Sequence, residues 1–189
     1  MQWRKGKIAL EENVPHLELA VYNGQYYVSF PPVPTVPLYL LSFIFGFNIP
    51  DTLLLQLYAV FACLLLHKML LKYTTPTKAA LLAFLLCFAS SLLPILQNGA
   101  VWYQAQVLAF LFTVWSFERM SENKPTASLI LYALSVGCRP FNALYGPLIM
   151  LIYILQQESL KKAIKKLLPG VLLGLLVASI YAWYNYIRF

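Results

Sequence analysis

The chain has 189 residues, of which 60% are hydrophobic and 11% are charged, and its net charge is +7. Soluble domains carry about a quarter charged residues, so this composition excludes an ordinary soluble fold. Most of the positive charge lies just beyond the ends of apolar runs, which is the pattern of membrane topology and argues against nucleic acid as a partner.

Residues 1–33 form the only long polar region and are predicted to be an extramembrane segment. Within it, the run from Leu19 to Phe30 is rich in Tyr and Val and contains Asn23-Gly24, the usual two-residue hairpin turn. We therefore expect a small hairpin, which Pro31 and Pro32 end because proline is disfavoured inside strands and helices.

Residues 34–189 are predicted to be a transmembrane helical domain. The longest stretch without an ionisable residue, Ala79 to Phe117, has 39 residues, about twice the length needed to cross a bilayer as a helix. The expected fold is all-α and integral to the membrane, with about six transmembrane helices plus one short interfacial or spanning helix. The apolar segments are 34–49, 52–71, 79–96, 101–117, 126–138, 141–157 and 167–187.

The distribution of lysine and arginine predicts which loops face the cytoplasm. Nine of the fourteen basic residues fall in loops that share one side, and four of them lie in the run from Lys161 to Lys166. If the short segment 34–49 crosses the membrane, the N-terminus also lies in the cytoplasm, and twelve basic residues face the cytoplasm against two outside. If the segment lies along the interface, the N-terminus is outside, and nine basic residues face the cytoplasm against five outside. Charge favours the first arrangement, whereas the segment's shortness and prolines favour the second.

The sequence offers no pattern of metal ligands. Cys63, Cys87 and Cys138 lie inside apolar segments, where cysteine behaves as a small hydrophobic residue. His16 and His67 are far apart in the chain. No metal site and no cofactor are therefore expected from the residues, and a divalent metal requirement stays open.

Several anchor segments resemble membrane glycosyltransferases of the GT-C type, which use polyprenyl-phosphate sugars and include protein O-mannosyltransferases and aminoarabinose transferases. The resemblance lies in residues 22–34, in Val101-Trp102-Tyr103-Gln104-Ala105-Gln106, in Gly137-Cys138-Arg139-Pro140 and in the last six residues. It implies a multi-pass protein of the cytoplasmic (inner) membrane that contacts membrane lipid and a lipid-linked sugar donor. It also implies that segment 34–49 is interfacial.

Such an enzyme moves a sugar from a lipid phosphate to an acceptor at the outer membrane face, using a carboxylate base. In the resembled family that base is an Asp that follows a first transmembrane helix, and neither is present here. The chain is therefore expected to be a fragment that is inactive alone. Among its own residues, Glu18 is the candidate catalytic carboxylate, with a solvated loop residue as the competing interpretation.

The candidate substrate-binding residues lie near the expected outer face. Arg139 sits between two short apolar segments, and a charge at a membrane helix break is costly and often functional. Gln104 and Gln106 are candidates to line a polar cavity, and Arg188 and Tyr27 complete the set. The competing interpretation for the two arginines is an interfacial anchor.

Two other classes remain open. A transporter or flippase-like protein would share the broken helices around Arg139, although the sequence shows no clear internal repeat. A non-catalytic membrane scaffold would tolerate replacement of Arg139, Gln104 and Gln106.

Overall fold

The computed structural model describes residues 2–15 and 17–188. The elements in chain order are the 3₁₀ helix η1 (Gln2–Lys5), the strands β1 (Leu19–Tyr22) and β2 (Gln25–Val28), the helices α1 (Thr35–Phe45), α2 (Asp51–Leu70), α3 (Pro76–Phe88), α4 (Leu92–Ile95), α5 (Val101–Ser121) and α6 (Pro125–Cys138), the 3₁₀ helix η2 (Pro140–Leu144), and the helices α7 (Tyr145–Leu155) and α8 (Leu160–Tyr186).

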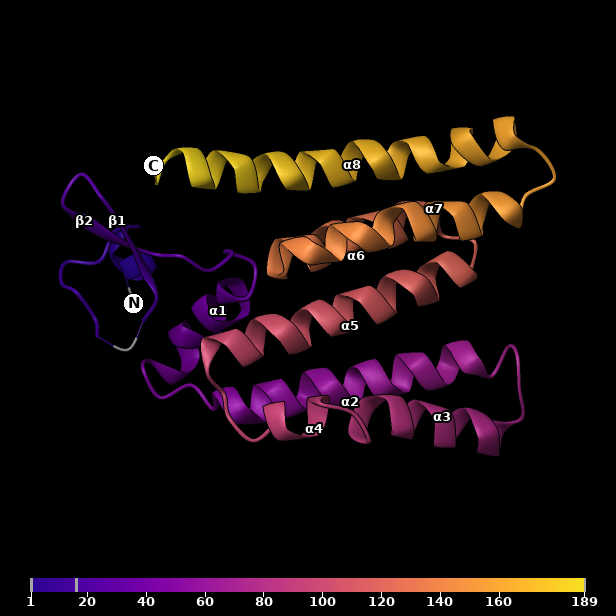
Figure 1. Cartoon of the computed structure of the whole chain (residues 1–189), viewed down its shortest axis with the longest axis horizontal. Helices are drawn as coiled ribbons and strands as arrows, with labels where there is room; N and C mark the ends of the chain where they lie inside the picture. The colour runs from indigo at the N-terminus through magenta and orange to yellow at the C-terminus, as the bar shows by residue number, and fades with distance from the viewer. Residues whose placement is uncertain (1, 16, 189) are drawn as a thin grey trace.

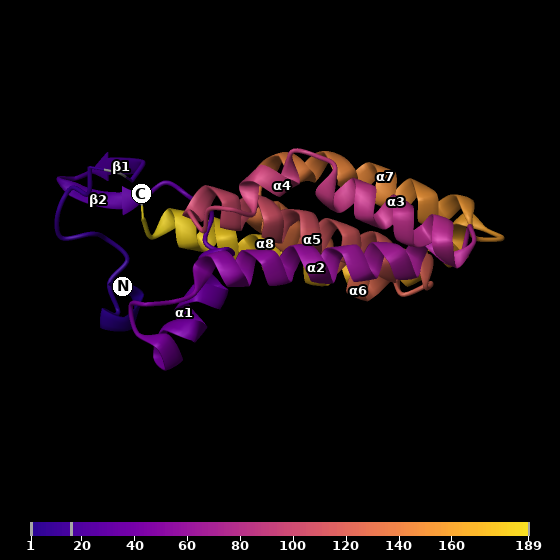
Figure 2. The same cartoon turned by 90° about the horizontal axis from the view of Figure 1, so that it is seen from below.

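The long helices lie side by side along one axis of an elongated molecule (Figures 1 and 2). Helix α5 packs against α2 on one side and α6 on the other, α6 packs against α8, and α3 covers α2. The buried residues of α5 and α6 therefore form the centre of the bundle, while α3 and α8 lie at its edges.

The expectation of about six transmembrane helices is wrong. Among the described residues, two helices, α2 and α8, are long and apolar enough to cross a membrane. Helices α1, α3 and α6 have only 11 to 14 residues, and η2 and α7 together span Pro140–Leu155. A helix needs about 20 apolar residues to cross the hydrocarbon core. The structure therefore supports two candidate spans, which indicate association with a membrane.

Local breaks explain why the apolar segments yield short helices. The segment 79–96 is interrupted after Phe88, and a single turn, α4, follows Ser90 and Ser91. Helix α5 has 21 residues but contains two glutamines and Glu118. The opposite occurs in α8, where the lysine-rich run and the last apolar segment join into one 27-residue helix through Pro169.

The outward faces of the bundle are strongly apolar. Large hydrophobic side chains of α2, α3, α7 and α8 are exposed, among them Leu64, Leu81, Leu151 and Leu172, each at least 51% accessible. Soluble monomers rarely expose apolar surface on this scale. These faces are a second indication of membrane association.

The N-terminal residues form a small cap at one end of the bundle (Figure 1). The hairpin predicted over Leu19 to Phe30 is present, with Leu19 opposite Val28 and Asn23 in the left-handed region at the turn. Arg4 donates to the Ser42 carbonyl of α1 at 3.1 Å, and Trp3 contacts the ring of Tyr184 near the end of α8. We call this the cap end and the opposite one the basic end.

The two ends differ sharply in charge. Nine basic and three acidic residues lie at the basic end, giving 9 − 3 = +6, whereas the cap end has five basic and four acidic residues, giving +1. Helix α1 stays at the cap end, and the N-terminal residues lie there with the loop before α5 and with the end of α8. Nine basic residues therefore lie at one end of the molecule and five at the other, while the membrane side of each end remains a prediction.

Glycines allow α8 to approach α6 closely. A Cβ atom added at Gly170 would meet the Thr126 Cα at 2.9 Å and the Pro125 carbonyl oxygen at 3.1 Å, both backbone atoms of α6. At Gly174, one turn later, the nearest atom would be the Leu129 carbonyl oxygen at 3.5 Å, an ordinary contact. Small residues at such a helix interface permit close backbone packing.

We therefore expect Gly170→Ala to destabilise the bundle and Gly174→Ala to leave its stability unchanged or raise it. At Gly170 the backbone atoms of α6 cannot give way, and such overpacking costs about 1–3 kcal/mol. At Gly174 the gain in helix propensity, up to about 1 kcal/mol, meets no clash. Thermal unfolding of both variants in detergent micelles would measure this difference. Equal midpoints for the two variants would contradict the close α6–α8 contact.

Candidate polar cleft between α5 and η2

A row of hydroxyl groups joins α5 to α6 through the centre of the bundle. The Ser116 and Ser128 hydroxyls lie 3.0 Å apart, and each also donates to the carbonyl oxygen of the other residue. Further along, the Thr113 and Ser135 hydroxyls are 2.7 Å apart. Because few polar partners exist inside an apolar bundle, these groups satisfy one another and fix the register of the two helices.

The row ends where Arg139 and Pro140 stop α6. Arg139 is extended, with φ −141° and ψ 108°, as expected for a residue before proline. The chain then forms η2, and the Asn142 amide donates to Ser135 Oγ at 2.6 Å and to Thr113 Oγ1 at 3.2 Å. The asparagine thus ties the 3₁₀ turn to the α5–α6 seam.

Beyond this stop lies a polar cleft of about 490 Å³. Helix α6 has 14 residues whereas α5 has 21, so α6 ends short of its neighbour and leaves the space open. The Arg139 guanidinium donates to Gln106 Oε1 at 3.2 Å across it. The residues that line the cleft are Gln106, Ala109, Phe110, Thr113, Arg139, Phe141, Asn142 and Tyr145.

The cleft is chemically suited to an anion with attached hydroxyl groups. Arg139 is half-buried and supplies a permanent positive charge with several N–H donors, which is the preferred geometry for phosphate. Gln106, Asn142 and Tyr145 add amide and phenol groups that can bond to hydroxyls. No carboxylate is among the lining residues, and the described residues contain no cluster of three or more His, Cys, Asp or Glu side chains that could hold a metal.

Two of the sequence candidates lie elsewhere. Gln104 is buried on another face of α5, and its Nε2 donates to the Asp51 carbonyl at the start of α2, 2.6 Å away. Arg188 is also buried, donates to the Val28 carbonyl of β2 and to Asn185 Oδ1, and stacks on Tyr184. These contacts give both residues a structural role, while ligand contact by either remains a prediction.

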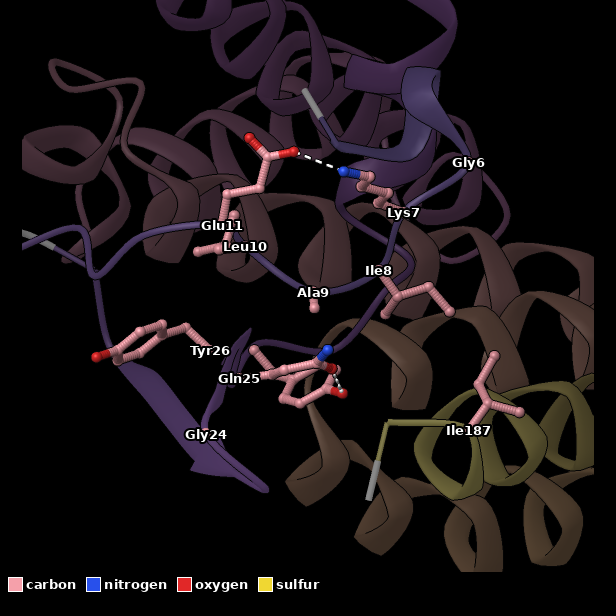
Figure 3. Close-up of a pocket in the computed structure, with 11 residues that line it drawn as sticks. Gly6, Lys7, Ile8, Ala9, Leu10, Glu11, Gly24, Gln25, Tyr26 and Ile187 are labelled. Atoms are coloured by element: carbon pink, nitrogen blue, oxygen red, sulfur yellow. Dashed lines mark hydrogen bonds and ion pairs between the residues drawn. The ribbon is translucent and has the colours of Figure 1, made fainter.

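Tyr27 and Glu18 belong to the cap. Tyr27 is buried, its hydroxyl donates to Gln25 Oε1 at 2.7 Å, and it lines a gap of about 560 Å³ between β2 and the chain from Gly6 to Glu11 (Figure 3). The Lys7–Glu11 ion pair, at 2.7 Å, lies along the 6–11 segment that forms one wall of this gap. Glu18 is exposed, and its backbone carbonyl accepts from Ser29. Neither residue lines the polar cleft, and His16 lies outside the described residues.

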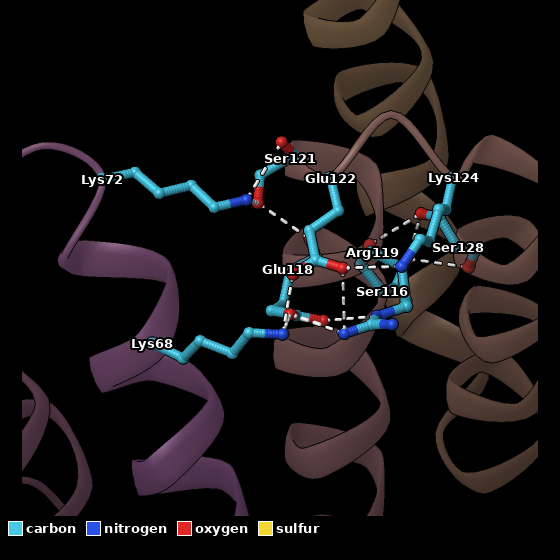
Figure 4. A network of polar contacts seen from close by, with 9 residues as sticks. All are labelled: Lys68, Lys72, Ser116, Glu118, Arg119, Ser121, Glu122, Lys124 and Ser128. Atoms are coloured by element: carbon cyan, nitrogen blue, oxygen red, sulfur yellow. Dashed lines mark hydrogen bonds and ion pairs between the residues drawn. The ribbon is translucent and has the colours of Figure 1, made fainter.

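Sequence reasoning missed the charged cluster at the basic end (Figure 4). The Glu118 side chain has no solvent exposure and accepts from Lys68 Nζ at 2.7 Å and from Arg119. Glu122 binds Lys68 at 2.6 Å and Lys124 at 3.0 Å. Because a buried carboxylate is costly without partners, this cluster fixes the end of α2 against α5. The signal was available, since Lys68 in the last turn of α2 is opposite in charge to Glu118 and Glu122.

The cluster predicts a pH dependence of stability. The hydrogen bonds from Lys68 and Lys124 lower the pKa of Glu122 from 4.5 to about 2. A carboxylate whose pKa is depressed in the folded state stabilises above its unfolded pKa, and this contribution is lost as the pH falls through the folded pKa. We therefore expect the thermal unfolding midpoint in micelles to fall between about pH 4.5 and pH 2, and less steeply in Glu122→Gln.

Glu158→Gln is the matched control. Glu158 lies just before α8, pairs with Lys162 in the first turn of that helix and is 86% exposed, so its loss should leave the slope unchanged. If Glu122→Gln showed the wild-type slope as well, the cluster would not be a source of acid sensitivity.

The fold and the cleft together define a helical, membrane-associated protein with a polar cleft at a helix interruption. Comparison of the chain with models of protein families, with curated proteins and with solved structures finds no match.

Proposed function

We propose that this chain carries the donor site of a glycosyltransferase that moves a sugar from a polyprenyl-phosphate donor to an acceptor at the outer membrane face. The observation that carries the proposal is Arg139, a half-buried residue whose guanidinium donates to Gln106 in an open cleft at a helix interruption. A costly charge at such a place favours an anionic ligand over a simple anchor. The apolar outer faces of the bundle suit the lipid part of the donor.

In this reaction an acceptor oxygen attacks the anomeric carbon, and the bond from that carbon to the phosphate oxygen breaks. The phosphate leaves with the electron pair, and a carboxylate takes the acceptor proton. Arg139 is positioned to stabilise the charge that develops on the leaving phosphate. The base has to come from outside the cleft lining, and Glu18 and Asp51 are carboxylates of the same end of the molecule.

Membrane placement follows from the charge difference between the two ends. We propose that α2 and α8 cross the cytoplasmic membrane in opposite directions, which makes the chain multi-pass. The end with a net charge of +6 then faces the cytoplasm, because lysine and arginine are retained there. The cap, Arg139 and the cleft face the outer side.

A transporter of a lipid-linked or polar solute is the second candidate. Interrupted helices that expose backbone and charge are common at transporter binding sites, and the stop between α6 and α7 is of this kind. The two candidates share the ligand and differ in whether the sugar–phosphate bond breaks.

Binding of polyprenyl phosphate to the chain in phosphatidylcholine nanodiscs tests the donor site. Loss of charge-assisted hydrogen bonds costs about 1.5–3 kcal/mol, so Arg139→Gln should weaken binding by about tenfold or more. Lys5→Gln is the control, because Lys5 is an exposed cation of the same end that does not line the cleft.

Polyprenol without phosphate serves as the second ligand, and it should bind wild type and Arg139→Gln alike. Equal binding of polyprenyl phosphate by both proteins would contradict the proposal. With a labelled polyprenyl-phosphate sugar, appearance of the label on an acceptor supports the glycosyltransferase, whereas passage of the intact lipid between leaflets supports the transporter.

A further inference from the structure

A second cavity, of about 300 Å³, lies between the N-terminal residues, α1 and the end of α8. It shares no lining residue with the polar cleft. Its walls are mostly apolar and include Gln2, Trp3, Tyr39 and Tyr184. We propose that this cavity binds the pyranose ring of a neutral sugar. The inference rests on these residues alone and does not require the proposed function.

Three aromatic rings shape the cavity. Trp3 lies between Tyr39 and Tyr184, with ring centroids 5.9 Å apart in each pair and interplanar angles of 67° and 74°. These edge-to-face contacts hold the rings in place, so little ordering is needed when a ligand enters. The electron-rich face of an aromatic ring attracts the C–H bonds that line one face of a pyranose.

Gln2, a residue of the cavity wall, carries a hydrogen-bond acceptor without a partner in the described part of the chain. Gln2 Oε1 is buried and has no hydrogen-bond partner among the described residues. An unsatisfied buried acceptor is costly, and a hydrocarbon chain in the cavity would not recover that cost. A ligand with an O–H group would satisfy this atom, so the carbonyl favours a hydroxylated ligand over a lipid tail.

The neighbouring charges exclude a cationic ligand. The Arg188 guanidinium lies 4.8 Å from the centroid of the Tyr184 ring, and that of Arg4 lies 5.1 Å from the ring of Phe43, which contacts the cavity residue Tyr39. A ligand cation, the usual guest of an aromatic cage, would meet two like charges there. A volume of about 300 Å³ is at the lower limit of small-molecule sites, which fits a single ring.

Saturation-transfer NMR of the full chain in phosphatidylcholine nanodiscs, with methyl α-D-glucopyranoside and methyl α-D-mannopyranoside as probes, tests this site. Glycoside detergents are omitted because they carry the same ring. We expect saturation of the ring protons, strongest on one face of the sugar. Trp3→Leu and Tyr39→Leu remove a stacking surface, and each should weaken binding by about tenfold. Gln2→Leu keeps the size of the side chain and should weaken binding similarly by removing the acceptor.

Trp183→Leu is the matched control, because Trp183 is 64% exposed on α8 and does not line the cavity. It should bind both probes as wild type does. If Trp3→Leu, Tyr39→Leu and Gln2→Leu still bind polyprenyl phosphate as wild type does, the cavity and the donor site are distinct sites. The inference is overturned if neither glycoside gives saturation, if Trp3→Leu binds as well as wild type, or if cyclohexylmethanol binds more tightly than the sugars.

Discussion

The contact between α5 and α6 is the constraint on which the rest of this structure depends. Hydroxyl pairs, Ser116 with Ser128 and Thr113 with Ser135, join the two central helices in an otherwise apolar bundle. Apolar side chains alone allow helices to slide, because their packing energy changes little between similar registers, whereas hydrogen bonds inside a bundle fix one register. Helices α2 and α8 then pack on the outer faces of this pair.

The polar cleft is a consequence of that register together with the early end of α6. Asn142 bonds to both hydroxyls of the Thr113–Ser135 pair, so the turn after Pro140 is held directly on the seam. The guanidinium of Arg139 is thereby directed toward Gln106. A change in the seam would therefore move the donor site, which links the packing of the bundle to the proposed binding of a lipid phosphate.

The candidate site could be predicted only in part. Arg139 and Gln106 were found because each interrupts an apolar pattern, and the structure brings them together. The sequence predicts Gln104 and Gln106 to line one polar cavity, but residues two apart on a helix point in nearly opposite directions. Gln104 accordingly turns toward α2. The spacing of Gln106, Ala109, Thr113 and Ser116, which follows one helical face, would have pointed to the polar seam and was overlooked.

The sequence by itself determined the helical class, the hairpin at Asn23-Gly24 and the stop at Arg139-Pro140, because these follow from local composition and backbone preferences. It also determined which loops carry the positive charge. Only the tertiary structure decided how many helices are long enough to cross a membrane, since the helix breaks after Phe88 but continues through Pro169 in α8, and local propensity alone does not separate these two outcomes. It alone showed the buried ion pairs of Glu118, the cap folded onto the end of α8 and the aromatic cavity between them, because each joins residues far apart in the chain.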